Sequence, residues 1–461
     1  MLADLQANIL KGHGRSHTVN LFLQFDSVHS AQIKSFLNGT TVSDALTQLT
    51  DAAKFRMTRR SAGLVSLCFL TGAGYKALDV LAKAPVDQVF RGGMQSRQQK
   101  LNDPLPHTWD AHFQKPIHAM FLLAHDTAKL VKQAKVRFLA SLPDGVSVVG
   151  EEVGEAMKSI LSPGEGIEHF GYVDGRSQPL MLDEDIQRER DQKDGVSVWS
   201  PKFGLKTVLL QDPGNASSIS FGSFLVFRKL EQNPKAFRNA EMALAKNLGL
   251  RGRDKDRAGA MIVGRFKDGT PVSVQREDGF NSPVPNNFNH KDDPTGAKCP
   301  FHGHTRKTNP RGDSVSAGGV SEEDERSHSM ARRGITYGQR KAHPNSKKVS
   351  IAALPSGGVG LLFMAYQSDI KKQFEFVQSA WANNANFVSP DFLPAAHVTG
   401  IDPVIGQGPN GGPANPEGQA CPVAWGGGEK TPRIEFDFQG FVRLLGGEYF
   451  FAPSITTLKT L

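Results

Sequence analysis

The chain has 461 residues, of which 39% are hydrophobic and 22% are charged, as in an ordinary globular protein with a large core. Its formal net charge is +8, but Lys and Arg are scattered, which argues against nucleic-acid binding and favours attraction of small anionic substrates. The apolar stretches are too short to span a bilayer, and the N-terminus lacks a signal-peptide pattern. We therefore expect a cytoplasmic protein with neither a nucleic-acid nor a membrane partner.

The first part of the chain alternates strand-like and helical patterns. Strands are predicted at residues 18–25, 64–70, 118–124 and 146–153, and helices at 27–49, 75–84 and 126–139. In the first predicted helix, the inward positions are Ile33, Phe36, Leu37, Leu46 and Leu49. The order strand–helix–strand–strand–helix–strand predicts a ferredoxin-like unit.

A polar, charged stretch at residues 183–195 then predicts a solvated loop near a domain boundary. A second region follows, with strands predicted at 221–227, 360–367 and 441–451 and helices at 235–248 and 369–382. Between them, residues 279–326 are rich in Asn, Pro, Gly and charge. An irregular stretch that long inside a compact chain is usually functional or disordered, and we expect a functional one.

The three cysteines, Cys68, Cys299 and Cys421, are far apart and form no CxxC pair. This argues against a cysteine zinc site and against a disulfide framework, which fits a reducing compartment. Among the 14 histidines, His302 and His304 stand out in the run CPFHGHTRKTNPR at residues 299–311. The residues alone leave three interpretations open: a non-haem metal site using both histidines, a single haem ligand beside propionate-binding arginines, or an ordinary polar loop.

The run at 299–311 resembles the proximal-histidine segment of the dye-decolorizing peroxidases. Three further motifs in the same order are similar to this family: GYVDG at 171–175, ARRGITYG at 331–338 and GLLFMAY at 360–366. The resemblance covers most of the chain. It implies an α+β fold of two ferredoxin-like domains with antiparallel sheets, in the family's dimeric α+β barrel arrangement. Residues 1–195 would form the first domain, including the GxxDG loop, and residues 196–461 the haem-binding second domain.

The resemblance also assigns roles to individual residues. His304 would be the protein ligand to the iron of haem b, and a carboxylate on its other ring nitrogen would orient it. For that partner we favour Asp402, with Asp391 as the alternative. Further cofactor-binding residues would be arginines at the propionates and apolar residues in the distal pocket: Arg306, Arg311, Leu361 and Phe363.

The implied activity is that of a haem peroxidase that reduces hydrogen peroxide and oxidises dyes, phenols or other bulky organic donors. Asp174 would carry the proton between the peroxide oxygens, and Arg332 would stabilise the departing oxygen. The reference pKa of an aspartate is about 3.9, against about 6.5 for a histidine, so an aspartate base predicts activity that is best at acidic pH. Tyr337 and Trp381 are candidate relays for electrons from donors too large to enter.

The main alternative function is haem storage, transport or iron release without peroxidase turnover. Such a protein would share His304 and the arginines, but it would not need Asp174 and Arg332 to act in a reaction. An oligomer is possible, and the sequence does not specify one.

Overall fold

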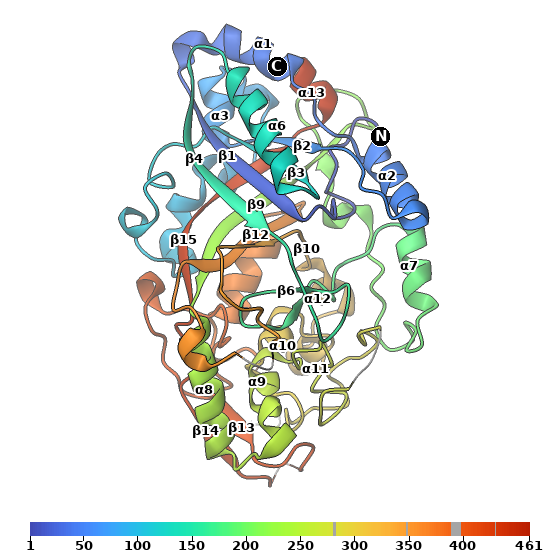
Figure 1. Cartoon of the computed structure of the whole chain (residues 1–461), viewed down its shortest axis with the longest axis vertical. Helices are drawn as coiled ribbons and strands as arrows, with labels where there is room; N and C mark the ends of the chain where they lie inside the picture. The colour runs from blue at the N-terminus through green and yellow to red at the C-terminus, as the bar shows by residue number, and fades with distance from the viewer. Residues whose placement is uncertain (280–282, 347–348, 389–397, 429) are drawn as a thin grey trace.

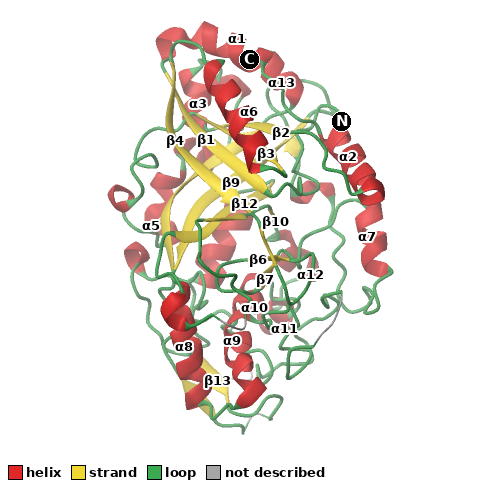
Figure 2. Ribbon diagram, viewed as in Figure 1, coloured by secondary structure: helices red, strands yellow, loops and turns green. Residues whose placement is uncertain are grey.

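The computed structural model describes residues 1–279, 283–346, 349–388, 398–428 and 430–461. One long, twisted antiparallel sheet runs through the upper part of the molecule, and irregular segments with a few helices fill the part below it (Figure 1; Figure 2). Both chain termini lie at the same end of the molecule (Figure 1). Within the described residues, no helix is long and apolar enough to cross a membrane.

The first half of the chain forms a ferredoxin-like unit, as predicted. Its strands are β1 His17–Phe25, β2 Val65–Leu70, β3 Ala119–His125 and β4 Val146–Glu155, and its main helices are α1 Ser30–Gly39, α2 Ala45–Thr58 and α6 Ala128–Ala140. The strands pair antiparallel in the order β4-β1-β3-β2. Val19 and Leu21 of β1 pack with α6, whereas Phe22 faces the main core. A strand covered on both faces is buried at nearly every position, as β1 is.

The helical stretch predicted at 27–49 is two helices rather than one. Residues 40–44 separate α1 from α2, and the Asp44 carboxylate caps the start of α2 by accepting a hydrogen bond from the Thr47 N–H at 2.8 Å. The break changes the rotational phase of the second helix, so Leu46, predicted to face inward, is 49% exposed. Ile33 and Leu37 of α1 are buried as predicted.

The second half repeats the same topology. Its strands are β9 Phe221–Gln232, β10 Ala331–Arg332, β11 Ile335–Tyr337, β12 Val359–Gln367 and β15 Val442–Ala452, and its main helices are α8 Pro234–Asn247 and α9 Asp256–Val263. They pair antiparallel in the order β15-β9-β12, with β10 and β11 both on β12. The predicted helix at 369–382 is present as two π-helical turns, Lys371–Glu375 and Val377–Ala382.

The two units join into one sheet and curve toward a barrel. Phe451 of β15 pairs with Leu70 of β2, which links the units at one edge. At the other side, β11 contacts β4, and the Thr336 hydroxyl donates a hydrogen bond to the Glu155 carbonyl. The last helix, α13 Ile455–Lys459, packs on α1 of the first unit. The domain boundary at residue 195 remains a prediction.

The segments below the sheet contain short elements that position the site. These are α7 Asp183–Arg190, α10 His304–Thr308, α11 Asp313–Gly318, α12 Glu322–Ser327, β5 Met157–Lys158, β6 Gly166–Ile167, β7 Val173–Asp174, β13 Ala420–Pro422 and β14 Arg433–Glu435. The remaining short elements are α3 Gly72–Ala77, α4 Gln88–Gly92, α5 Gln98–Leu101 and β8 Leu210–Gln211.

The loop predicted at 183–195 is wrong for its first eight residues, which form α7. Its first turn is acidic and its last turn basic, so the charges complement the helix dipole, and Ile186 is buried.

Candidate active site

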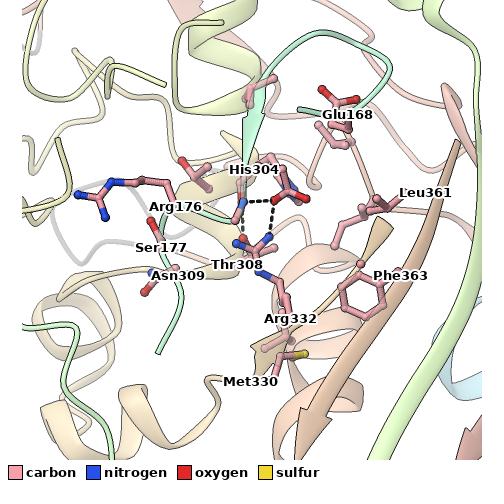
Figure 3. A pocket seen from close by; sticks show the side chains of 18 of the residues that line it. Glu168, Arg176, Ser177, His304, Thr308, Asn309, Met330, Arg332, Leu361 and Phe363 are labelled. Atoms are coloured by element: carbon pink, nitrogen blue, oxygen red, sulfur yellow. Dashed lines mark hydrogen bonds and ion pairs between the residues drawn. The ribbon is translucent and has the colours of Figure 1, made fainter. Parts of the chain in front are cut away.

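A large cavity lies between the sheet of the second unit and the segments below it. Its lining side chains come from β7, β9, β10, β12, β15, α10 and the loops between them. Figure 3 shows His304 near the centre of this cavity, with Arg332 facing it and Leu361 and Phe363 pointing in from β12. Residues far apart in the sequence therefore meet here: the GYVDG loop, the histidine segment, the double-arginine segment and β12.

His304 is the first residue of α10, and its imidazole is held by a carboxylate. Its Nδ1 lies 2.8 Å from Oδ2 of Asp402. The other oxygen of Asp402 accepts hydrogen bonds from the backbone N–H groups of Val404 and Ile405, at 2.7 and 3.0 Å. Because Asp402 is fully buried, this geometry fixes the ring and directs Nε2 to the cavity. Asp391, the alternative partner, lies outside the described residues.

Asp402 also changes the pKa of the His304 imidazole. Burial alone would lower the pKa of His304, but the negative charge of Asp402 and its hydrogen bond outweigh burial and raise it. The same negative charge increases electron density on the imidazole when its other nitrogen binds a metal. His304 therefore has the surroundings of a strong metal ligand.

The opposite side of the cavity holds an ion pair. Arg332 of β10 donates a hydrogen bond from Nη1 to Oδ1 of Asp174, on β7, at 2.9 Å. The same Oδ1 accepts a hydrogen bond from the Gly175 N–H at 2.7 Å. The two side chains are 36% and 33% exposed for Asp174 and Arg332, so both reach open cavity space. Gln178 accepts a hydrogen bond from the Arg332 backbone N–H at 2.9 Å, which ties the GYVDG loop to β10.

The neighbouring arginine, Arg333, points away from the cavity. Arg333 donates to the backbone carbonyls of Asn8 and Ile9, at 2.9 and 3.0 Å. Leu361 and Phe363 are two residues apart on β12, so they lie on the same face of the strand, and both line the cavity. The wall beside Arg332 is therefore apolar.

Two buried arginines line the cavity without a carboxylate partner among the described residues. Arg311 donates to the Asn286 and Phe288 carbonyls at 2.8 and 2.9 Å and lies over the ring of Trp199 at 3.8 Å. Arg265 donates to the Gly269 carbonyl at 2.7 Å. Burial lowers the pKa of both guanidinium groups, and the positive charge of a neighbouring arginine lowers it further, Arg176 for Arg265 and Arg265 for Arg311. An anion bound beside them would relieve this cost.

The prediction for Arg306 is corrected by its position. Arg306 is fully buried and is absent from the cavity lining. All five of its N–H donors are used, by the carboxylates of Asp293 and Asp313 and the carbonyls of Asp293 and Cys299. The α10 turn that directs His304 into the cavity sends Arg306, two residues later, to the opposite side. It anchors the histidine segment instead of binding a propionate.

Three other candidate residues, His302, Tyr337 and Trp381, do not line the cavity. His302 is 1% exposed and faces away from the cavity, with Nε2 at 3.9 Å from Cys421 Sγ. No group of three or more His, Cys, Asp or Glu suited to a metal occurs in the described part of the chain. Tyr337 and Trp381 are 8% and 5% exposed, and neither lines the cavity. Their relay role remains a prediction.

Several cavity residues were missed from the sequence. Arg265 and Glu168 line the cavity, and so does His290, whose buried Nδ1 has no hydrogen-bond partner among the described residues. Arg265 stands in the run GRF at residues 264–266, and this short run does not predict where its side chain points. Glu168 and His290 stand in irregular segments, where the sequence has no helix or strand periodicity that would predict which way a side chain points.

Comparison with known proteins decides the family. Residues 4–157 match the family model described as the DyP dimeric alpha+beta barrel domain, and residues 191–392 match the one described as Dyp-type peroxidase, C-terminal. The multifunctional dye peroxidase DyP2 of Amycolatopsis sp. is 45% identical over 100% of this chain and 96% of its own length. The chain belongs to the DyP-type peroxidase family. It is therefore a peroxidase that acts on dyes. The comparisons give no support for the alternative function of haem storage, transport or iron release.

Solved structures agree with this assignment. The DyP2 structure from Amycolatopsis sp. matches with a TM-score of 0.92 at 44% identity, covering 100% of this chain and 96% of that one. The DyP-type peroxidase of Anabaena sp. matches at 0.89 and 39% identity, covering 100% and 94%. A dye-decolorizing peroxidase in complex with 2,6-dimethoxyphenol matches at 0.77 and 25%, covering 99% and 98%.

DyP-type peroxidases are haem enzymes that use hydrogen peroxide and an organic reductant, and this cavity fits haem. A porphyrin is flat and apolar, with two carboxylates at one edge. The apolar wall of Leu361 and Phe363, the uncompensated guanidinium groups of Arg265 and Arg311, and the unpartnered His290 match those features. His304 also lines the cavity, and an imidazole nitrogen is a common ligand of haem iron.

Proposed function

We propose that the chain is a haem b peroxidase in which His304 holds the iron and Asp174 and Arg332 act on peroxide. The observation that carries this proposal is the placement of two opposed groups in one cavity. On one side is an imidazole oriented by a buried carboxylate, and on the other an aspartate–arginine pair that is partly open. Arg265 and Arg311 would bind the propionates, and Leu361 and Phe363 would border the peroxide.

Haem, when bound, supplies the iron at which peroxide is reduced and stores the oxidising equivalents. Asp402 keeps the proton of the His304 imidazole on Nδ1, so that Nε2 presents its lone pair to the cavity. Because Asp402 is itself fixed by two backbone N–H groups, the ring is held before the cofactor binds.

Asp174 is the proton carrier in this proposal. Its Oδ1 is occupied by Arg332 and by the Gly175 N–H, so Oδ2 is the atom that takes a proton from the inner oxygen of hydrogen peroxide. The same oxygen then returns the proton to the outer oxygen, which leaves as water. Arg332 stabilises the negative charge that develops on the leaving oxygen, and its permanent charge makes this independent of pH. An aspartate carrier favours activity at acidic pH.

The reducing substrates that we propose are dyes, phenols and other bulky organic donors. DyP2 is named a multifunctional dye peroxidase, and one structural neighbour is described with 2,6-dimethoxyphenol. The net charge of +8 would attract anionic dyes. Donors too large for the cavity would need a relay, for which Tyr337 and Trp381 were predicted.

A visible spectrum of the haem-loaded protein tests this function. A Soret band that shifts after one equivalent of hydrogen peroxide and returns on adding a dye is the expected result. A Soret band that only bleaches would contradict turnover, and a protein that acquires no Soret band would contradict the role of His304.

The compartment that we propose is the cytoplasm. All three cysteines are free and buried, as a reducing compartment allows. Cell fractionation with an antibody to the protein tests this, and recovery in the secreted fraction would contradict it.

A further inference from the structure

Tyr172 is a cavity-lining tyrosine with a carboxylate at its hydroxyl group. It is 3% exposed and precedes Asp174 by two residues in the GYVDG loop. Its hydroxyl donates a hydrogen bond to Oε1 of Glu241, on α8. Glu241 is also 3% exposed, and its other oxygen is bound by Arg238 at 2.9 Å and lies 3.6 Å from Lys267.

The contact between Tyr172 and Glu241 requires a glycine beside it. Gly259 of α9 packs against it, and a Cβ at that position would collide with both the Tyr172 hydroxyl and the Glu241 carboxylate. The Tyr172 ring packs edge-on against Phe237, at 6.2 Å between centroids. The phenol and the carboxylate are therefore held in contact by three elements: the GYVDG loop, α8 and α9.

The other tyrosines lack this combination. Of the five tyrosines, all of which are described, only Tyr172 lines the cavity. Tyr337, the relay predicted from the sequence, has a buried hydroxyl with no hydrogen-bond partner among the described residues. Tyr449 donates to a carboxylate, Glu375, at 3.0 Å, but it is in the main core and not at the cavity.

The surroundings of Tyr172 couple loss of an electron to loss of a proton. The Lys267 ammonium lies 5.5 Å from the ring centroid, which disfavours a positively charged ring. A one-electron-oxidised phenol is a strong acid, so a carboxylate in contact with its hydroxyl takes the proton. Burial keeps Tyr172 a neutral phenol at rest, because it raises the pKa of the hydroxyl far above its ordinary value.

We propose that Tyr172 is a redox-active residue that forms a neutral tyrosyl radical during turnover, with Glu241 as its proton acceptor. In this step the Tyr172 O–H bond breaks, the electron passes to the centre that peroxide has oxidised, and the proton passes to Oε1 of Glu241. An electron from an organic donor and the proton held on Glu241 then restore the phenol. The inference rests on the proposed peroxidase function, which supplies the oxidant.

The test is electron paramagnetic resonance of the haem-loaded protein, frozen after one equivalent of hydrogen peroxide, with the visible spectrum recorded on the same sample. Protein grown on ring-deuterated tyrosine should show a narrowed radical signal. Tyr172→Phe should lose that signal, because the variant keeps the ring but has no hydroxyl, and Tyr337→Phe should keep it. The Soret band should still respond to peroxide in both variants, because neither substitution changes His304, Asp174 or Arg332.

A second variant tests the proton acceptor. Glu241→Gln still accepts the hydrogen bond but cannot take the proton, so it should lose the tyrosyl signal while keeping the Soret response. A tyrosyl signal that survives in Tyr172→Phe, or a parent protein whose Soret band responds to peroxide without any tyrosyl signal, would overturn the inference and leave the peroxidase function intact. A parent whose Soret band does not respond would overturn the peroxidase function, and the inference with it.

Discussion

Asp402 and Asp174 are two carboxylates of the candidate site that differ in exposure: Asp174 lines the cavity, whereas Asp402 contacts His304 and does not line it. Asp402 is 0% exposed, with one oxygen on His304 and the other on two backbone N–H groups. The Asp174 side chain is 36% exposed, and only its Oδ1 is engaged. A carboxylate with both oxygens engaged can orient a neighbour, whereas one with a free oxygen can exchange a proton. Substitutions of these two carboxylates and of the side chains around them test this difference.

The largest effect should come from the ligand itself. His304→Ala removes the nitrogen that Asp402 orients, so we expect the Soret band to be lost or strongly weakened in a haem titration. His302→Gln is the control, because His302 faces Cys421 and Phe436 rather than the cavity. Loss of haem from the control but not from His304→Ala would show that the ligand had been assigned to the wrong histidine.

Asp174→Asn should slow the reaction with peroxide by about 10²–10⁴-fold, the usual contribution of a positioned acid–base group. The amide can still accept the Arg332 hydrogen bond, so haem binding should not change. Stopped-flow absorbance of the Soret band measures this rate. A rate equal to that of the parent would mean that Asp174 is not the proton carrier.

Arg332→Leu should keep haem and slow the peroxide reaction by about 10²–10³-fold, because a stabilising charge at the leaving oxygen is lost. Its neighbour gives the matched control. Arg333→Leu also loses a half-buried guanidinium, but one that binds the carbonyls of Asn8 and Ile9. We expect Arg333→Leu to unfold at lower temperature with an unchanged peroxide rate per haem, and equal slowing of both variants would contradict the assignment.

Asp402→Asn should weaken haem binding by about 10–100-fold, the usual effect of losing a partner of a metal-bound histidine. The Val404 and Ile405 N–H groups will hold the amide oxygen, which turns the amide NH₂ toward His304 Nδ1. That contact favours the tautomer with hydrogen on Nε2, which cannot bind iron. Asp212→Asn, at a fully buried aspartate that also accepts backbone N–H groups away from the cavity, should leave haem affinity unchanged.

The sequence predicted more of the fold than of the cavity. The sequence pattern identified all four strands of the first unit, because β1, β2 and β3 are rich in apolar residues and β4 carries four valines. The helix α7 was missed because it buries a single side chain, Ile186, and is stabilised by its end charges rather than by an apolar face.

The motifs predicted that His304, Asp174 and Arg332 belong to one site, and all three line the cavity. A motif does not show, however, which way each of its side chains points. Arg306 and Arg311 stand in one motif, and only the coil of α10 decides that Arg311 lines the cavity while Arg306 pairs with Asp293 and Asp313. Arg265 was missed for the same reason, since nothing in its local pattern fixes which way its guanidinium points.

The smallest effect concerns Glu168, a third carboxylate at the cavity. Burial raises its pKa to about 7, although the N–H groups of Phe170 and Tyr172 and the Gln232 amide oppose the shift. A raised carboxyl pKa means that the folded protein binds this proton more tightly than the unfolded chain. The parent should therefore gain stability as the pH falls from about 7 toward the ordinary glutamate value of 4.5.

Glu168→Gln should lose that gain, which at about 1.4 kcal/mol per pKa unit has an upper limit of about 3 kcal/mol because Glu168 is partly exposed to the cavity. Urea unfolding of parent and variant at acidic and at slightly alkaline pH measures the difference. Glu448→Gln is matched, since burial also raises the pKa of Glu448 to about 7, on β15 beside Met94. Both variants should flatten the pH dependence of stability, but Glu168→Gln alone should alter the peroxide rate, because Glu168 alone lines the cavity with Asp174. Equal peroxide rates in both variants would separate Glu168 from the reaction and leave Asp174 as the carboxylate that acts there.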